Sequence, residues 1–230
     1  HQGKVTGEIG STYTGGLFGS DMSTAEATDS SNIVIGKDTV IKGDISTAGV
    51  VGKTWSGLTN CVSYANVVGS GNFTNGIAQT GGKSVFYSNC MNYGDVNGAD
   101  YVAGITSTNS KPSGASEIKV ENCYNLGNIS STKETVNIGA ISYMTANLFT
   151  VANSYNLGTV KDLSGDKAQF NANDTYTNVA YNSENGIAAA EGTTGITGYA
   201  AAQFKDRTVV DALNANDGVE ETVWYQNTEN

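Results

Sequence analysis

Three carboxylates at repeated positions are the first candidates for chemistry in this sequence. Glu8, Asp44 and Asp95 each follow a glycine and precede an isoleucine or a valine, so we assign them to one outward ladder of a repeat. A carboxylate pair separated by about 6.5–9.5 Å suits inverting glycoside hydrolysis. If Asp44 and Asp95 lie two stacked strands apart, their separation is about 10 Å. This distance disfavours a catalytic pair, and we predict no catalytic residue.

Groups that hold metals or activate nucleophiles are scarce. The chain has one histidine, His1, and one arginine, Arg207. A His-ligated zinc site or a Ser-His-Asp triad therefore has no histidine to use in the body of the chain. Acidic residues in the loops at 21–29 and 162–166 match neither an EF-hand nor a Gly-Gly-x-Gly-x-Asp repeat. We predict no cofactor and no metal site, with calcium bound at these loops as the alternative.

Aromatic residues offer binding chemistry. Tyr64 and Tyr93 share one repeat position with two leucines and are expected to face the core. Tyrosines at an alternating position are expected to face outward, where rings with neighbouring amides could stack on a sugar or a peptide. The plainer alternative is an ordinary amphipathic surface. The predicted ligand-binding residues are Tyr124, Asn125, Tyr155 and Asn156.

A repeat must position all of these residues. Four segments, beginning at residues 60, 89, 122 and 153, share the pattern Asn, small residue, two variable residues, Tyr or Leu, Gly or Ala, polar, Val or Ile. The Gly/Ala position also matches Gly7 and Gly43, with steps of 22 to 36 residues. A second element, such as Gly76-Ile77-Ala78, follows most copies. Short Val-, Ile- and Tyr-rich segments bounded by Gly and Asn read as strands and turns, so each period matches one coil of a parallel β-solenoid.

Equivalent positions of stacked coils would form ladders. The small residues are expected to point inward as Cys61, Cys90, Cys123 and Ser154, buried thiols being the main expectation and a disulfide between neighbouring rungs the alternative. The asparagines are expected to form an amide ladder at a corner through Asn60, Asn89, Asn122 and Asn153. The 29 glycines would mark turns, and the charged fraction of only 15% fits because stacked like charges repel.

The end of the chain has a different pattern. Residues 200–214 carry apolar side chains spaced for one helical face, and residues 222–225 resemble a strand. We predict an all-β, right-handed parallel β-helix over residues 1–181 and a C-terminal helix/strand cap over residues 182–230, which would cover the open end. The helix would turn these side chains inward: Ala201, Phe204, Val209 and Leu213.

Charge and hydropathy limit the partners. The net charge of −10 makes nucleic acid an improbable partner. No run of about 18 apolar residues occurs, so membrane insertion is not expected. No signal peptide is visible, and we interpret the chain as a mature or excised fragment. The loops at 20–32 and 107–117 vary most in length and are the best candidates for a binding face.

The Asn-Cys-Tyr-Asn-x-Gly-x-Val/Ile pattern and the following Gly-apolar element resemble the GLUG-type repeats of bacterial cell-surface, adhesin-like proteins. Similar repeats occur beside the catalytic region of IgA1-protease-type metallopeptidases. The resemblance covers about residues 5–180, although the first two coils lack the Asn-Cys element. It implies an extracellular location, on the bacterial cell surface or secreted. A metallopeptidase His-Glu-x-x-His motif is absent, so no protease activity carries over.

We therefore predict a non-catalytic, adhesin- or stalk-like module of a larger surface protein, which binds a host or matrix glycan or protein. Two alternatives stay open. One is a polysaccharide-degrading enzyme on a β-helix, and the other is an accessory repeat region of a secreted metallopeptidase.

Overall fold

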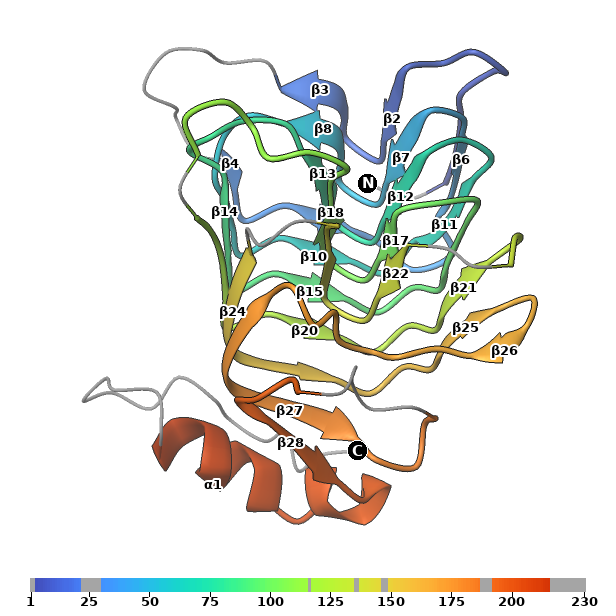
Figure 1. Ribbon diagram of the computed structural model, residues 1–230. Coiled ribbons are helices and arrows are strands. Elements are labelled where there is room, and N and C mark those ends of the chain that lie inside the picture. The colour runs from blue at the N-terminus through green and yellow to red at the C-terminus, as the bar shows by residue number, and fades with distance from the viewer. Residues whose placement is uncertain are drawn as a thin grey trace.

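The computed structural model describes residues 3–21, 30–115, 117–134, 137–145, 149–186 and 192–215. They form a β-solenoid of about five turns, with the first coil at one end and a short helix at the other (Figure 1). The predicted parallel solenoid is confirmed. Within these residues, every strand pairing is parallel except that of β25 with β26.

Four sheets run along the solenoid; sheets A, B and C are each built around one strand position of successive coils, and sheet D contains two. Sheet A contains β1 (Lys4–Thr6), β6 (Val40–Gly43), β11 (Asn66–Gly69), β16 (Val96–Gly98), β21 (Ile129–Ser131), β25 (Val160–Asp162) and β26 (Gly165–Asp166). Sheet B contains β2 (Tyr13–Gly15), β7 (Ser46–Ala48), β12 (Phe73–Asn75), β17 (Val102–Ala103) and β22 (Ile138–Gly139). Sheet C contains β3 (Phe18–Asp21), β8 (Val51–Thr54), β13 (Ala78–Thr80), β18 (Thr106–Ser107) and β23 (Ser142–Tyr143).

Sheet D is the largest and includes the last two strands. Its members are β4 (Ser30–Ser31), β5 (Val34–Ile35), β9 (Leu58–Thr59), β10 (Val62–Ser63), β14 (Phe86–Ser88), β15 (Met91–Asn92), β19 (Ile118–Glu121), β20 (Tyr124–Asn125), β24 (Phe149–Asn156), β27 (Thr175–Asn182) and β28 (Ile196–Tyr199). Each coil passes through this sheet twice, before and after a bend. The core lies between the sheets and is filled mainly by Val and Ile side chains.

The bend in sheet D is made by an asparagine in every coil. Six asparagines have a φ between 46° and 57°, in the left-handed region that asparagine tolerates better than most residues. They are Asn32, Asn60, Asn89, Asn122, Asn153 and Asn178. The pairing of Val62 with Val34 places Asn32 at the first bend, which the sequence analysis missed because isoleucine follows it in place of cysteine. The pairing of Ser154 with Val179 places Asn178 at the last bend.

The register of the first two coils differs from the prediction. Asn66 pairs with Val40, and Gly69 pairs with Gly43. Asp44 therefore lies opposite Ser70, while Asp95 lies opposite Asn66 because Val96 pairs with Val67. The Gly-polar-Ile segments at residues 7 and 43 match each other but belong to a later corner of the coil.

A glycine corner joins sheets B and C. A Cβ atom on Gly76 would lie 2.0 Å from the carbonyl oxygen of Gly104, and one on Gly104 would lie 2.1 Å from that of Ala140. Neighbouring coils thus approach too closely here for a side chain. In the last copy Ala140, and not Gly139, occupies the place of Gly104, because Ala103 pairs with Gly139. The apolar residue after each corner is buried in the core, as at Ile77 and Ile105.

The C-terminal segment extends and covers sheet D. It contains β28, the 3-10 helix η1 (Ala201–Phe204) and the α-helix α1 (Thr208–Ala215). The expected helix over 200–214 is in two pieces, because the chain turns at Arg207, whose φ is 73°. Val209 and Leu213 are buried as predicted, against the outer side of sheet D. The predicted strand at 222–225 lies outside the described residues, and the cap boundary at residue 182 stays a prediction.

Candidate functional site

Asn125 and Asn156 do not belong to a surface site, which corrects the prediction. Both are 0% exposed. Strand side chains alternate between faces, so these asparagines share the inward face with Cys123 and Ser154, two residues earlier. Asn92 Nδ2 donates to Asn125 Oδ1 at 2.7 Å, and Asn125 Nδ2 donates to Asn156 Oδ1 at 2.8 Å. They form an inner amide ladder that connects coils inside the core.

Tyr124 and Tyr155 point outward and stack on each other, with ring centroids 4.8 Å apart and an interplanar angle of 10°. They are not open to a ligand as predicted, because the C-terminal segment covers them. Phe204 lies 5.9 Å from the Tyr155 ring, and Tyr124 is only 8% exposed. Burial raises the pKa of both phenols. The pair anchors the C-terminal segment to the wall of the solenoid.

Tyr64 and Tyr93 face outward, contrary to the prediction that they face the core. They have the same parity as Val62 and Met91, so the period of two places them on the outer face. Their rings stack at 4.4 Å, both are partly exposed, and Lys37 Nζ lies 5.7 Å from the Tyr64 centroid. Tyr93 also shares a hydroxyl–hydroxyl hydrogen bond with Tyr124. We call Tyr64, Tyr93 and Lys37 the tyrosine patch.

The small-residue ladder lies inside the coil. Cys61, Cys90, Cys123 and Ser154 are all 0% exposed, and the three thiols are free, so the alternative of a disulfide is wrong. The amide of Cys90 donates to Cys123 Sγ at 3.3 Å, and the amide of Cys123 donates to Ser154 Oγ at 3.1 Å. Burial, together with the thiol of the next coil, raises the pKa of Cys90. The ladder links coils and does not present reactive thiolates.

The corner asparagines are linked through part of their length. Asn60 Nδ2 donates to Asn32 Oδ1 and Asn89 Nδ2 donates to Asn60 Oδ1, both at 3.1 Å. Asn178 Nδ2 donates to Asn153 Oδ1 at 2.9 Å and also to the Leu213 carbonyl of α1 at 2.8 Å. Asn122 keeps the left-handed bend, but its buried Oδ1 has no hydrogen-bond partner. The ladder therefore supports the bends and joins α1 to the solenoid.

The candidate carboxylates serve as links between coils at different corners. Asp95 Oδ1 accepts from the backbone amide of Asn128 at 2.8 Å and from its side chain at 3.2 Å. Asp44 accepts from the Gly10 amide at 2.7 Å and from the Ser70 hydroxyl at 2.8 Å. These bonds, the Gly10 amide first, lower the pKa of Asp44. Asp44 and Asp95 do not share the predicted ladder position.

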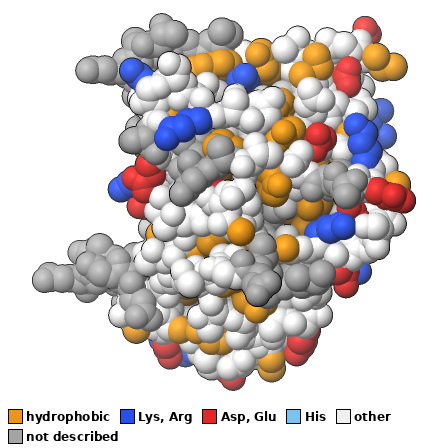
Figure 2. Space-filling model, in the orientation of Figure 1, with side chains coloured by type: hydrophobic (Ala, Val, Ile, Leu, Met, Phe, Trp, Pro, Cys, Tyr) orange, Lys and Arg blue, Asp and Glu red, His pale blue; other side chains and the backbone are white. Residues whose placement is uncertain are grey.

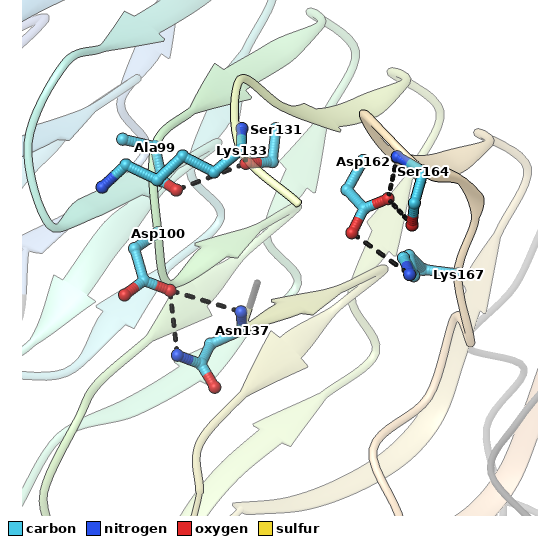
Figure 3. A network of polar contacts seen from close by, with 8 residues as sticks. All are labelled: Ala99, Asp100, Ser131, Lys133, Asn137, Asp162, Ser164 and Lys167. Carbon is cyan, nitrogen blue, oxygen red and sulfur yellow. Dashed lines mark hydrogen bonds and ion pairs between the residues drawn. The ribbon is translucent and has the colours of Figure 1, made fainter. Parts of the chain in front are cut away.

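The loop acids considered for calcium have protein partners where they are described. Asp162 accepts from the amide and hydroxyl of Ser164 and pairs with Lys167 Nζ at 3.2 Å (Figure 3). In the described ranges, no group of three or more His, Cys, Asp or Glu side chains is placed to hold a metal. Most of the loop at 20–32 lies outside those ranges, and its role and that of residues 107–117 stay predictions.

The sequence analysis missed a second aromatic row at the junction of sheets B and C. The Tyr101 ring lies 5.2 Å from that of Phe73 and 6.4 Å from that of Tyr143. Phe73 and Tyr101 share one repeat column, because Thr74 pairs with Val102, whereas Tyr143 belongs to sheet C. Asp100, beside Tyr101, accepts from Asn137 Nδ2 at 2.9 Å (Figure 3). The signal available in the sequence was an aromatic residue three residues before the corner glycine, as Phe73 stands before Gly76 and Tyr101 before Gly104.

Comparisons with protein-family models, with curated proteins and with solved structures returned no match. The class of protein that the geometry defines is therefore a parallel β-solenoid with internal amide and small-residue ladders. None of the described helices has the length and apolar character needed to cross a membrane.

Proposed function

We propose that this protein is a non-catalytic module of a larger bacterial surface protein, extracellular or secreted, that holds a rigid form and binds a host or matrix glycan or protein. The observation that carries the proposal is the tyrosine patch. It offers two stacked, partly exposed rings beside a lysine on the outer wall of the solenoid. Flat amphipathic rings of this kind suit contact with sugar faces or peptide side chains.

The ladders support the stalk-like part of the proposal. Coils are joined by backbone pairing in four sheets and by side-chain bonds inside and outside the core. Hydrogen bonds between equivalent side chains of neighbouring coils favour one register, although Asn92 Oδ1 and Asn122 Oδ1 have no partner. A stiff solenoid keeps its surface features at fixed separations, which is useful for a module that presents binding sites at a distance from a cell.

The bonding of the acidic residues favours a binding module over a polysaccharide-degrading enzyme. Asp44 and Asp95 lie at different corners, and each uses its carboxylate to accept hydrogen bonds from another coil. A general acid or base needs a carboxyl group directed at the substrate, paired with a second at a defined separation. The alternative predicts turnover of a polysaccharide that Asp44→Asn or Asp95→Asn abolishes.

The proposal is tested by applying the purified chain to arrays of glycans and of host and matrix proteins. We expect a ligand whose binding Tyr64→Ala weakens about tenfold, because ring contacts of about 1 kcal/mol and the adjacent lysine contact are lost together. Leu163→Ala is the matched control, since Leu163 is 66% exposed in the β25–β26 turn, away from the patch. Binding that both variants reduce equally, or no binding on either array, would contradict the proposal.

A further inference from the structure

Sheets B and C face each other along a line that we call the B/C seam. The chain enters along sheet B, turns at the glycine corner inside the solenoid, and leaves along sheet C (Figure 1). Hydrogen bonds cross the seam: Ser46 Oγ donates to the Gly52 carbonyl at 2.6 Å, and Ser107 Oγ donates to the Tyr101 carbonyl at 2.7 Å. These bonds tie sheet B to sheet C, and several side chains at the outer ends of the strands, which we call the mouth of the seam, are partly exposed.

Aromatic rings line the mouth of the seam over successive coils. Near the first coils, the Tyr13 and Trp55 rings meet edge to face at 6.4 Å, and Lys53 Nζ lies 4.9 Å from the Trp55 centroid. Further along, the partly exposed Tyr101 ring contacts the ring of Phe73, which is 7% exposed, and that of Tyr143. In Figure 2, hydrophobic side chains are distributed over this face among uncharged polar groups, with charged side chains between them. The row follows the axis of the solenoid.

Tyr101 has a strained backbone in this row. Its φ is 44°, a region where a non-glycine residue other than Asn, Asp or His is uncommon. Two bonds hold the conformation, from Ser107 Oγ to its carbonyl and from its own amide to Asp100 Oδ1 at 3.0 Å. Strain of this kind costs about 1–3 kcal/mol and concentrates at functional sites. The bend directs the Tyr101 ring between those of Phe73 and Tyr143.

Polar groups and a hollow flank the rings. The hydrogen bonds from Tyr101 and from Asn137 all reach one oxygen of Asp100, its Oδ1. Beyond Tyr143 lies a hollow of about 230 Å³, whose lining includes Lys167 and Asn171. Rings with a few placed amide, carboxylate and ammonium groups are the usual composition of a site for a polyhydroxylated ligand.

We propose that the B/C seam binds a neutral, extended polysaccharide that lies along the solenoid axis. Coils rise by about 4.8 Å, which is comparable to the length of one sugar unit in an extended chain, so the partly exposed rings along the seam are spaced in register with sugar units. The net charge of −10 disfavours a polyanionic chain. A peptide added as a strand is disfavoured because the strands that flank Tyr101 already pair on both sides. The site is separate from the tyrosine patch.

The test is isothermal titration calorimetry of the full chain with soluble neutral hexasaccharides of glucose, xylose, mannose and galactose, and with polygalacturonate. We expect at least one neutral hexasaccharide to bind, and Tyr101→Gly to weaken that binding about tenfold through loss of a ring contact of roughly 1.4 kcal/mol. Glycine adopts a positive φ without steric cost, so this variant removes the ring while the melting temperature is kept. Tyr143→Ala should weaken binding similarly, and Tyr64→Ala should leave it unchanged.

Three results would each overturn the inference: no binding of any neutral hexasaccharide, binding that Tyr101→Gly and Tyr143→Ala leave unchanged, or a preference for polygalacturonate. Failure of the proposed function would be distinguishable. In that case Tyr64→Ala would have no effect on any array ligand, whatever the seam binds.

Discussion

The inner amide ladder makes a prediction that can be worked through from its contacts. Asn125 has no exposed surface and takes part in three hydrogen bonds. Its Nδ2 donates to the Gly127 carbonyl at 2.7 Å and to Asn156 Oδ1 at 2.8 Å, while its Oδ1 accepts from Asn92 Nδ2 at 2.7 Å. Asn125→Leu keeps a similar volume and removes all three bonds, so the effect of a cavity is small.

The expected loss of stability is about 3 kcal/mol. Each intramolecular hydrogen bond contributes about 1 kcal/mol net, and a buried partner left without a bond costs about 1–3 kcal/mol. Asn92 Nδ2 keeps its bond to the Gly94 carbonyl, and Asn156 Oδ1 keeps that from the Gly158 amide. The Gly127 carbonyl and Asn156 Oδ1 each lose the donor from Asn125, but Asn156 Oδ1 still has the Gly158 amide. The three lost bonds therefore dominate the cost, and most of the larger penalty for buried groups without a partner is avoided.

The matched control is Asn128→Ala on the outer ladder. Asn128 is exposed and bonds to Asp95 and Thr159. Water replaces such bonds, so we expect a loss of at most about 1 kcal/mol. Urea unfolding followed by circular dichroism measures both variants, with the slope m checked because solenoids can unfold in parts. A cost for Asn125→Leu below 1 kcal/mol, or equal to that of Asn128→Ala, would refute the role assigned to the inner ladder.

Further predictions concern the ends of the ladders and one buried acid. Asn92 Oδ1 is buried without a partner, and Ser63 is the equivalent residue of the preceding coil. Ser63→Asn supplies a donor for this oxygen and should raise the free energy of unfolding by about 1 kcal/mol. A decrease would mean that the core around Ser63 is too small for an asparagine side chain. Burial raises the pKa of Asp174 from 3.8 to about 7. Between these two pKa values the folded state keeps the proton on Asp174, whereas the unfolded state releases it. The free energy of unfolding should therefore fall as the pH rises from about 4 to about 7. Asp174→Asn should flatten this dependence in melting curves, and an unchanged profile would exclude Asp174 as its source. A thiol-specific reagent should leave the native protein unlabelled and label three cysteines after unfolding; rapid native labelling would contradict the buried ladder.

The fold could be predicted because the repeated sequence pattern indicates where each coil bends and which side chains point inward. An asparagine before a small residue marks a left-handed bend followed by an inward position, and this combination occurs in four coils. The first coils were placed in the wrong register because the Gly-polar-Ile segments at residues 7 and 43 occupy a different corner from Gly94-Asp95-Val96. A three-residue pattern is too short to distinguish two glycine corners of one coil. Asn32 marks the correct register of its coil, but Ile33 follows it and takes the inward position that cysteine has in the later coils.

The predicted ligand-binding residues failed for two separate physical reasons. Parity along a strand decides which side chains face the core, and counting two residues from Cys123 puts Asn125 inside. That information was in the sequence. The covering of Tyr124 and Tyr155 was not, because it depends on how the C-terminal segment folds back onto sheet D through Phe204 and Leu213. Contacts between a repeat and the segment that follows it have no periodic signal.

The contrast between repeated and unrepeated positions indicates where function lies in this protein. Residues that recur in several coils, such as Cys90 and Asn125, are buried and bond one coil to the next, so their chemistry is used for stacking. Recognition requires groups that differ from coil to coil, because identical rungs present the same contact everywhere and define no site. The mouth of the B/C seam has this property: on its sheet B side, Tyr13, Ser46, Phe73 and Tyr101 occupy equivalent places in successive coils. The variation within an otherwise regular row, together with the strained backbone of Tyr101, makes the seam the part of the solenoid best suited to selective binding.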